Sequence, residues 1–161
     1  MGLPYAFAYF FVDGQGVEEA LDLYRRLYQP SERHPLPQAT ICVWALAADR
    51  SDEAHRQALS RECWRVDRAR GVLGPLQAPE AVAERGFSAA ERSTVEAMRR
   101  KAFVGTGVQV ADGLRALAQE LALDHLVINT WAHDPAVQRH SYALLAAEFG
   151  LVAADTLAPP A

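Results

Sequence analysis

The sequence predicts an α/β protein built around a parallel β-sheet. Three segments, at residues 4–12, 39–47 and 126–131, are largely apolar. They lack the alternation of polar and apolar residues that marks a strand with one solvent-exposed face. Continuous apolar runs of this kind are typical of strands buried on both faces, as in parallel sheets. Each run is followed by a segment with apolar residues at helical spacing. Strands that alternate with amphipathic helices predict right-handed βαβ units.

Length and composition narrow the class of protein. The chain has 161 residues, of which 50% are hydrophobic and 22% charged, with a net charge of −4. It is long enough for one packed domain and too apolar for a disordered chain. The net negative charge disfavours binding to the phosphate backbone of a nucleic acid. No apolar run approaches the roughly 20 residues of a membrane span. Two cysteines, Cys42 and Cys63, are expected to be buried free thiols. We therefore expect a cytoplasmic protein with no nucleic-acid and no membrane partner.

The first half of the chain predicts two strand–helix units. Asp13 to Gly16 breaks the first strand, and a helix over 17–27 carries acidic residues in its first turn and arginines in its last. After a proline-rich loop comes the strand at 39–47. Asp49 and Ser51 are expected to cap a helix that runs to about residue 70. The mixed charges over 52–70 predict a solvent-exposed helix face.

The second half predicts an extra helix and two more strand–helix units. Ser88 and Glu91 form a capping-box pattern that opens a helix to about residue 102, after an irregular stretch with one short turn at 80–84. A short strand at Phe103 and Val104 leads to a helix for which Thr106 is the expected N-cap. The strand at 126–131 precedes a helix over 136–149, with Pro135 in its first turn.

Two architectures accommodate four βα units. Four βα units make up half of a (β/α)₈ TIM barrel, since a whole barrel needs about 250 residues. The other possibility is a small open doubly wound sheet. We expect a domain over residues 1–150 and a flexible tail over 151–161, because the tail contains a Pro-Pro pair and no apolar periodicity.

Candidate functional residues follow the strands, since the loops at the carboxyl ends of parallel strands carry the sites of such folds. Tyr9, Phe10 and Phe11 would give an aromatic surface for a flat ring, with ordinary core packing as the alternative. Asn129 and His133, near the end of the last strand, could orient a substrate or exchange a proton. The alternative for His133 is a loop residue beside the next helix.

Other motifs do not identify a site. The stretch Gly105-Thr106-Gly107 has two of the three glycines of a dinucleotide-binding turn, but Val110 stands in the third position. A turn with Thr106 as the N-cap of the next helix is the better explanation of this stretch. His133, Asp134 and His140 are close in sequence but lack the i, i+4 spacing of helical metal ligands, so no metal is predicted.

Several segments resemble those of the bacterial luciferase-like flavin-dependent monooxygenases and follow one another in the same order along the chain. The stretch GLPYAFA at residues 2–8 is similar to a strand of that family, and ADRSDEA at 48–54 to its ADTDEEA motif. Further similar segments are LYR and YQPS within 23–31, FVGT with the helix to residue 117, residues 124–135, and the SYALLA helix at 141–146. The resemblance extends nearly end to end, to about residue 150.

The resemblance implies the C-terminal half of a (β/α)₈ barrel. The family binds reduced flavin, usually FMN and in some branches a deazaflavin, and uses O₂ to oxygenate a small organic substrate. Carried over by position, Ala8, Tyr9, Phe10 and Trp131 would be cofactor-binding residues. Asn129 and His133 would be the catalytic pair. Where the family commonly has Ser-His-Phe, this chain has Tyr-Phe-Phe at residues 9–11.

The same resemblance implies an incomplete site. The family's flavin phosphate contacts, and most ring contacts, come from strands that precede the Gly-Leu-Pro strand. We therefore expect a truncated form that binds flavin weakly or not at all on its own. The alternative is a non-catalytic half-barrel that covers its open edges by homodimerisation or by pairing with a missing N-terminal half.

Overall fold

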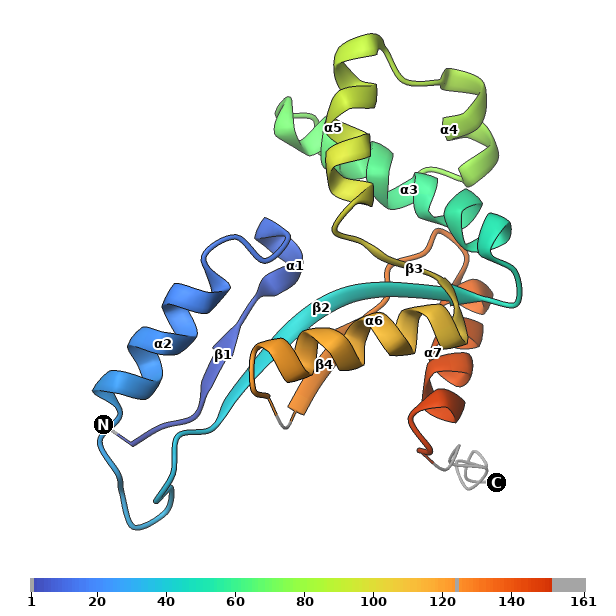
Figure 1. Cartoon of the computed structure of the whole chain (residues 1–161). Coiled ribbons are helices and arrows are strands. Elements are labelled where there is room, and N and C mark those ends of the chain that lie inside the picture. The colour runs from blue at the N-terminus through green and yellow to red at the C-terminus, as the bar shows by residue number, and fades with distance from the viewer. Residues whose placement is uncertain (1, 124, 152–161) are drawn as a thin grey trace, which may run out of the picture.

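A computed structural model describes residues 2–123 and 125–151 (Figure 1). They form an α/β fold around a four-stranded sheet, and every pair of strands in it is parallel. The strands are β1 (Tyr5–Phe7), β2 (Ala39–Ala48), β3 (Phe103–Thr106) and β4 (His125–Asn129). The predicted parallel sheet is confirmed. Most of the predicted tail, residues 152–161, lies outside the described residues.

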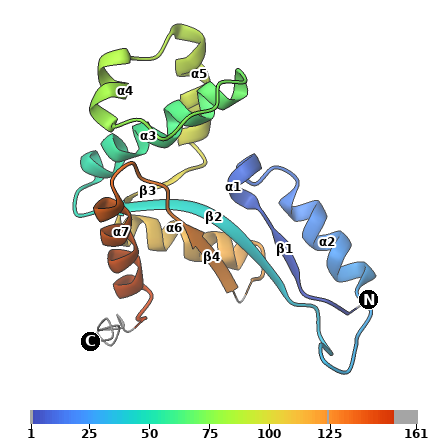
Figure 2. The same ribbon diagram turned by 180° about the vertical axis from the view of Figure 1, so that it is seen from behind.

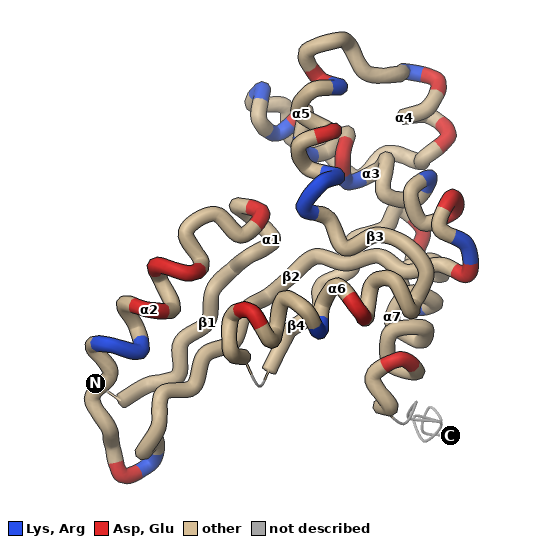
Figure 3. Tube along the Cα trace, in the orientation of Figure 1, with Lys and Arg blue, Asp and Glu red and all other residues tan. Residues whose placement is uncertain are grey.

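Helices connect and cover the strands. They are α1 (Tyr9–Val12), α2 (Val17–Leu27), α3 (Ser51–Ala69), α4 (Pro79–Arg85), α5 (Ala89–Arg99), α6 (Gly107–Glu120) and α7 (Pro135–Glu148). Helices α3, α4 and α5 gather over the second half of β2, and α6 and α7 lie on its other side (Figures 1 and 2). No strand carries Lys, Arg, Asp or Glu, so charge is confined to helices and loops (Figure 3). No helix within the described ranges is long and apolar enough to cross a bilayer.

Strand β2 is the centre of the sheet because all three other strands pair with it. Its first half pairs with β1 and β4, and residues 45–48 pair with β3. In a series of consecutive barrel strands, each strand lies beside the next one along the chain. Here β4 pairs with β2, and the sheet is open. The parallel α/β class was therefore predicted correctly, whereas the consecutive order of a simple half-barrel is not the order of this sheet.

The first predicted strand is wrong over its second half. Strand β1 ends at Phe7, and residues 9–12 turn into the short helix α1. Asp13 ends that helix in the left-handed conformation (φ 48°), and its backbone N–H donates to the Tyr9 carbonyl. Phe11 is 53% exposed, so this part of the run is not a buried strand. An apolar run without periodicity does not distinguish a strand from a helical turn, and here tertiary packing decides.

The two faces of β2 belong to two different clusters. Ile41, Val43, Ala45 and Ala47 point towards the main core, which α2, α6 and α7 complete with residues such as Leu114. The alternate residues Trp44 and Leu46 point the other way, where Ala58 of α3 covers them. Because successive side chains of a strand alternate, this one strand joins the main core to the region that α3 covers.

Helix ends agree with the sequence in most cases. Ser88 and Thr106 each form the predicted capping box, with Glu91 and Gln109 as the reciprocal partners. Pro135 occupies the first turn of α7, and Asp134 caps it by accepting from the Ala136 N–H at 2.7 Å.

The short helical turn expected at 80–84 is confirmed as the helix α4. Three smaller predictions need correction. The helix expected to be capped by Asp49 or Ser51 has Arg50 at its N-cap with no side-chain cap bond, and Asp49 instead contacts His140 at 3.0 Å. The last strand ends at Asn129 rather than Trp131. Cys63 is buried as predicted, but Cys42 is only half-buried.

Two buried hydroxyl groups tie the carboxyl end of β2 to the last unit of the fold. Thr130 donates from Oγ1 to the Ala45 carbonyl at 2.8 Å, and the Ser141 Oγ accepts from the Ala47 N–H at 2.9 Å. Both side chains are fully buried. A buried backbone group that loses its partner keeps its full desolvation cost, so these bonds fix the position of α7 against β2.

Replacing Ser141 by alanine should therefore lower the free energy of unfolding by about 1–3 kcal/mol, because the Ala47 N–H is left buried without an acceptor. Urea unfolding followed by circular dichroism measures this change. Ser60→Ala is the matched control, since the Ser60 Oγ is buried and has no hydrogen-bond partner among the described residues. That variant should be neutral or slightly more stable. An equal loss in both variants would contradict the assigned role of Ser141.

Candidate functional site

A groove lies between α1 and α3, close to where β4 ends. We call it the aromatic groove, and it has a volume of about 400 Å³. Helix α1 faces the C-terminal part of α3 across it (Figure 2). Its lining residues are Phe10, Phe11, Arg61, Trp64, Arg65, Arg68, Ala69 and Trp131. The volume falls within the range of small-molecule sites.

Three rings pack edge to face at one end of the groove. Phe10 and Trp131 have ring centres 5.7 Å apart at an interplanar angle of 74°. Trp64 and Trp131 have ring centres 5.3 Å apart at 84°. The positive edge of one ring meets the negative face of the next, which is a favoured aromatic geometry. Residues from α1, α3 and the loop after β4 thus form one aromatic wall.

Arg61 lies beneath this wall and is only 5% exposed. Its guanidinium carbon is 4.2 Å from the centre of the Trp44 ring and 6.0 Å from that of Trp131. Nη2 donates to the Phe10 carbonyl at 3.1 Å, whereas Nε has no hydrogen-bond partner among the described residues. Burial, with a further contribution from neighbouring Arg65, lowers the pKa of Arg61 to about 10. The side chain therefore stays positively charged at neutral pH inside an aromatic setting.

Two further arginines extend the positive charge along the same face of α3, because positions 61, 65 and 68 are one and two helical turns apart. Arg65 forms an ion pair with Asp13. Arg68 lies 5.2 Å from the Trp64 ring centre and 5.7 Å from that of Phe11. The lining contains three arginines and no acidic residue. The arrangement favours a flat, negatively charged ligand.

The chain is 31% identical over 144 residues to the luciferase-like monooxygenase of Escherichia coli (strain K12), covering 89% of this chain and 43% of the relative. It is 28% identical over 149 residues to the uncharacterized protein YwcH of Bacillus subtilis (strain 168), covering 92% of this chain and 44% of the relative. The crystal structure of apo-MsnO8 matches with a TM-score of 0.82 at 30% identity, over 93% of this chain and 46% of that chain. No protein-family model matches the chain.

The chain resembles the luciferase-like monooxygenase family. The resemblance stated from sequence motifs is thereby confirmed. The chain spans about half the length of the curated relatives that it matches, at 43% and 44% of their residues. It therefore corresponds to part of a luciferase-like monooxygenase, and its fold aligns with part of a related solved structure.

The structure brings together two of the residues predicted from the family resemblance, and a third lies on the same face of the sheet. Phe10 and Trp131 meet in the aromatic wall. Asn129 pairs in register with Trp44, so the two residues project from the same face of the sheet. Because Trp44 contacts Arg61, Asn129 lies on the face of the sheet that leads to the groove.

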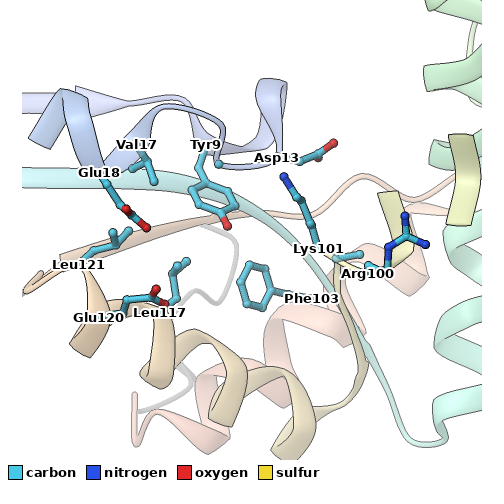
Figure 4. A pocket seen from close by; sticks show the side chains of 12 residues that line it. Tyr9, Asp13, Val17, Glu18, Arg100, Lys101, Phe103, Leu117, Glu120 and Leu121 are labelled. Carbon is cyan, nitrogen blue, oxygen red and sulfur yellow. The ribbon is translucent and has the colours of Figure 1, made fainter. Parts of the chain in front are cut away.

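Two other predicted cofactor residues do not join that wall. The Tyr9 ring points into a separate pocket, where its centre is 6.4 Å from that of Phe103 (Figure 4). Burial raises the pKa of Tyr9, and the nearby carboxylates of Asp13 and Glu120 raise it further. Ala8 is exposed at the N-cap of α1. Tyr9 and Phe10 are neighbours in the helical turn that follows β1, but their side chains point to different pockets.

His133 lies in the loop after β4 and is exposed. Its Nδ1 is 2.9 Å from the Leu76 carbonyl, and a carbonyl can only accept, so Nδ1 carries the proton. In the neutral ring, Nε2 is therefore left as an acceptor. His133 is not a lining residue of the aromatic groove. It fixes the loop between α3 and α4, to which Trp64 also donates through the Gly74 carbonyl at 3.1 Å.

Sequence reasoning missed Arg61, Trp64, Arg65 and Arg68. The mixed charges of α3 were interpreted as a solvent-exposed face, and for Arg61 that interpretation is wrong. Their spacing of three to four residues places them on one side of the helix, which was the available signal.

No group of three or more His, Cys, Asp or Glu side chains that could hold a metal ion occurs in the part of the chain described by the structure.

Three polar contacts hold helix α1 and its C-cap against α3. They are the Arg65–Asp13 ion pair, the Arg61 bond to the Phe10 carbonyl and a 3.5 Å bond from Arg65 Nη2 to the Phe11 carbonyl. Replacing Asp13 by asparagine removes the first contact and keeps a residue type that tolerates the left-handed backbone. The opening free energy of α1 should fall by about 1 kcal/mol, which speeds amide exchange near residues 11–15 about fivefold. Hydrogen exchange measured by NMR tests this. Asp112→Asn, which removes an exposed pair with Arg115, should leave exchange in α1 unchanged.

Proposed function

We propose that the chain is the C-terminal half of a luciferase-like monooxygenase, which uses reduced flavin and O₂ to oxygenate a small organic substrate. The observation that carries the proposal is the aromatic groove with its buried cation, in a chain that resembles this family. FMN is the proposed cofactor, with a deazaflavin as the other possibility that the family offers. When bound, the reduced flavin supplies the electrons with which O₂ is activated.

The residues of the groove fit one side of a flavin site. Phe10 and Trp131 would contact the flat ring, and Arg61 would favour negative charge near it. Small-molecule sites normally bury roughly 70–90% or more of the surface of the ligand. Phe11 and Arg68 in the lining are themselves exposed, so one side of the groove faces solvent. This supports a site to which a further segment contributes, and weak flavin binding by the chain alone.

The chain's own residues would exclude water, orient the substrate and move a proton. The rings of Phe10, Trp64 and Trp131 would keep the reacting centre dry, which strengthens every electrostatic interaction inside it. Asn129 has an amide that can both donate to and accept from a substrate oxygen. His133 would act through Nε2, since Nδ1 is engaged with the Leu76 carbonyl.

The chain alone and a chimera test this function. Purified as it is, the chain should bind FMN weakly, and it should not retain flavin through gel filtration. A chimera that carries the N-terminal part of the Escherichia coli relative ahead of residue 2 should bind FMN at least about tenfold more tightly and take up O₂ when supplied with reduced FMN. Flavin fluorescence and an oxygen electrode give the two readouts.

Variants of the chimera connect the result to the groove. Trp131→Ala should weaken FMN binding, whereas Phe87→Ala, remote from the groove lining, should not. A chain that purifies alone with stoichiometric flavin would show that the site is complete. A chimera that folds cooperatively and still binds no flavin would contradict the proposed function.

A second candidate function is a non-catalytic half-barrel that acts by association with another polypeptide. One face of the sheet favours it, because Ala6, Cys42 and Val127 share a face with Thr40 and His125, and no residue of that set is buried. Val127 is 50% exposed. An uncharged sheet face with open edges is prone to pairing. The proposed partner is a second copy of this chain or the missing N-terminal half.

Replacing Val127 by lysine should weaken such association, because the new charge would have to be buried in the interface. Native mass spectrometry and gel filtration over a range of concentrations measure the mass relative to the 17.7 kDa monomer. Val108→Lys is the matched control, since Val108 on α6 is 54% exposed but lies away from the open sheet face. A monomeric chain with a cooperative melt at all concentrations would exclude self-association.

A further inference from the structure

Arg61 is a buried cation whose charge no carboxylate balances among the described residues. The two nearest acidic side chains are engaged elsewhere. Glu62 forms two bonds of 2.7 Å to Arg99, and Asp13 pairs with Arg65. Arg61 itself donates to the Phe10 carbonyl, and its Nε has no partner. Burying an unpaired charge is costly, and an anion bound in the groove would offset that cost.

Arg68 provides a second positive group at the same site. It is exposed, and no ion pair with an acidic residue is formed by it within the described ranges. Its guanidinium lies over Trp64 and Phe11, which restricts it to the rim of the groove. Guanidinium groups bind carboxylates and sulfonates through parallel hydrogen bonds, so one buried and one rim arginine suit an acidic group of a ligand.

The rest of the lining suits a flat ring. Phe10, Trp64 and Trp131 meet edge to face, an arrangement that presents ring faces and edges at different angles to the groove. A planar aromatic molecule can stack on one of these rings while its edge meets another. The volume of about 400 Å³ accommodates a molecule of one or two rings.

We propose that the α3 side of the aromatic groove binds a small planar aromatic acid, with its ring against Trp64 and its carboxylate or sulfonate group held by Arg61 and Arg68. Phe10 and Trp131 remain available to the flavin ring. As a statement of substrate class, this inference rests on the proposed monooxygenase function. The binding step itself requires no flavin, so it is tested separately from the activity.

The test uses the chain's own fluorescence, because all of its three tryptophans either line the groove or contact Arg61. Benzoate is the probe and benzamide its neutral counterpart, with cyclohexanecarboxylate as the non-aromatic acid. Benzoate should change the emission of the full chain saturably at low salt. Benzamide and cyclohexanecarboxylate should each bind about tenfold more weakly, because each lacks one of the two recognised features. Isothermal titration calorimetry provides an independent measurement.

Variants assign the binding to the two arginines. Arg61→Gln should weaken benzoate binding about tenfold, and Arg68→Gln should weaken it severalfold. Arg68 is exposed, so its variant is informative even if the Arg61 variant fails to fold. Arg26→Gln, in the last turn of α2, is the matched control and should bind benzoate like the unaltered chain.

Three results with the benzoate series would overturn the inference, and a fourth comes from competition with phosphate. These are no saturable benzoate binding, equal binding of benzamide, and full retention of binding in both arginine variants. Equal competition by inorganic phosphate would indicate a general anion site and would also contradict it. Benzoate binding together with a chimera that fails to bind FMN would leave this inference standing and reject the monooxygenase proposal. The reverse pattern would reject only the aromatic acid.

Discussion

The alternation of side chains along β2 is the constraint on which the rest of the structure depends. One set of alternate residues, such as Val43 and Ala45, completes the main core with α2, α6 and α7. The other set begins half-exposed at Cys42 and becomes buried at Trp44 and Leu46, where α3 covers the strand. Since β1, β3 and β4 all pair with β2, its register decides which residue of each neighbour faces the core and which faces the groove.

The groove exists because α1 interrupts the first apolar run. If residues 9–12 had continued as a strand, Phe10 and Tyr9 would alternate across the sheet. As a helical turn, they send Phe10 to Trp131 and Tyr9 to Phe103. The turn is fixed by the left-handed Asp13, whose carboxylate also reaches Arg65 of α3. Backbone geometry and one ion pair together thus position an aromatic wall over a buried arginine.

Much of the fold could be predicted from the chain. Capping boxes at Ser88 and Thr106 are local hydrogen-bonding patterns, so they are visible in four consecutive residues. The candidate site was predictable only in part. Trp131 was predicted from its place after the last strand and lines the groove, whereas Arg61 was missed because a charge on a helix normally faces water. Its burial depends on Trp44, which is distant in sequence, and no local pattern reports such a contact.

The sequence by itself determined the parallel α/β class, the helix boundaries that depend on caps, and the resemblance to the luciferase-like monooxygenase family. These follow from residue types at short spacing and from motifs in a fixed order. Only the tertiary structure decided that β4 pairs with β2, that residues 9–12 form a helix, and that Arg61 lies buried among aromatic rings. The physical reason is that apolar runs and charged helices each fit several environments. Only packing against residues far along the chain selects one of them.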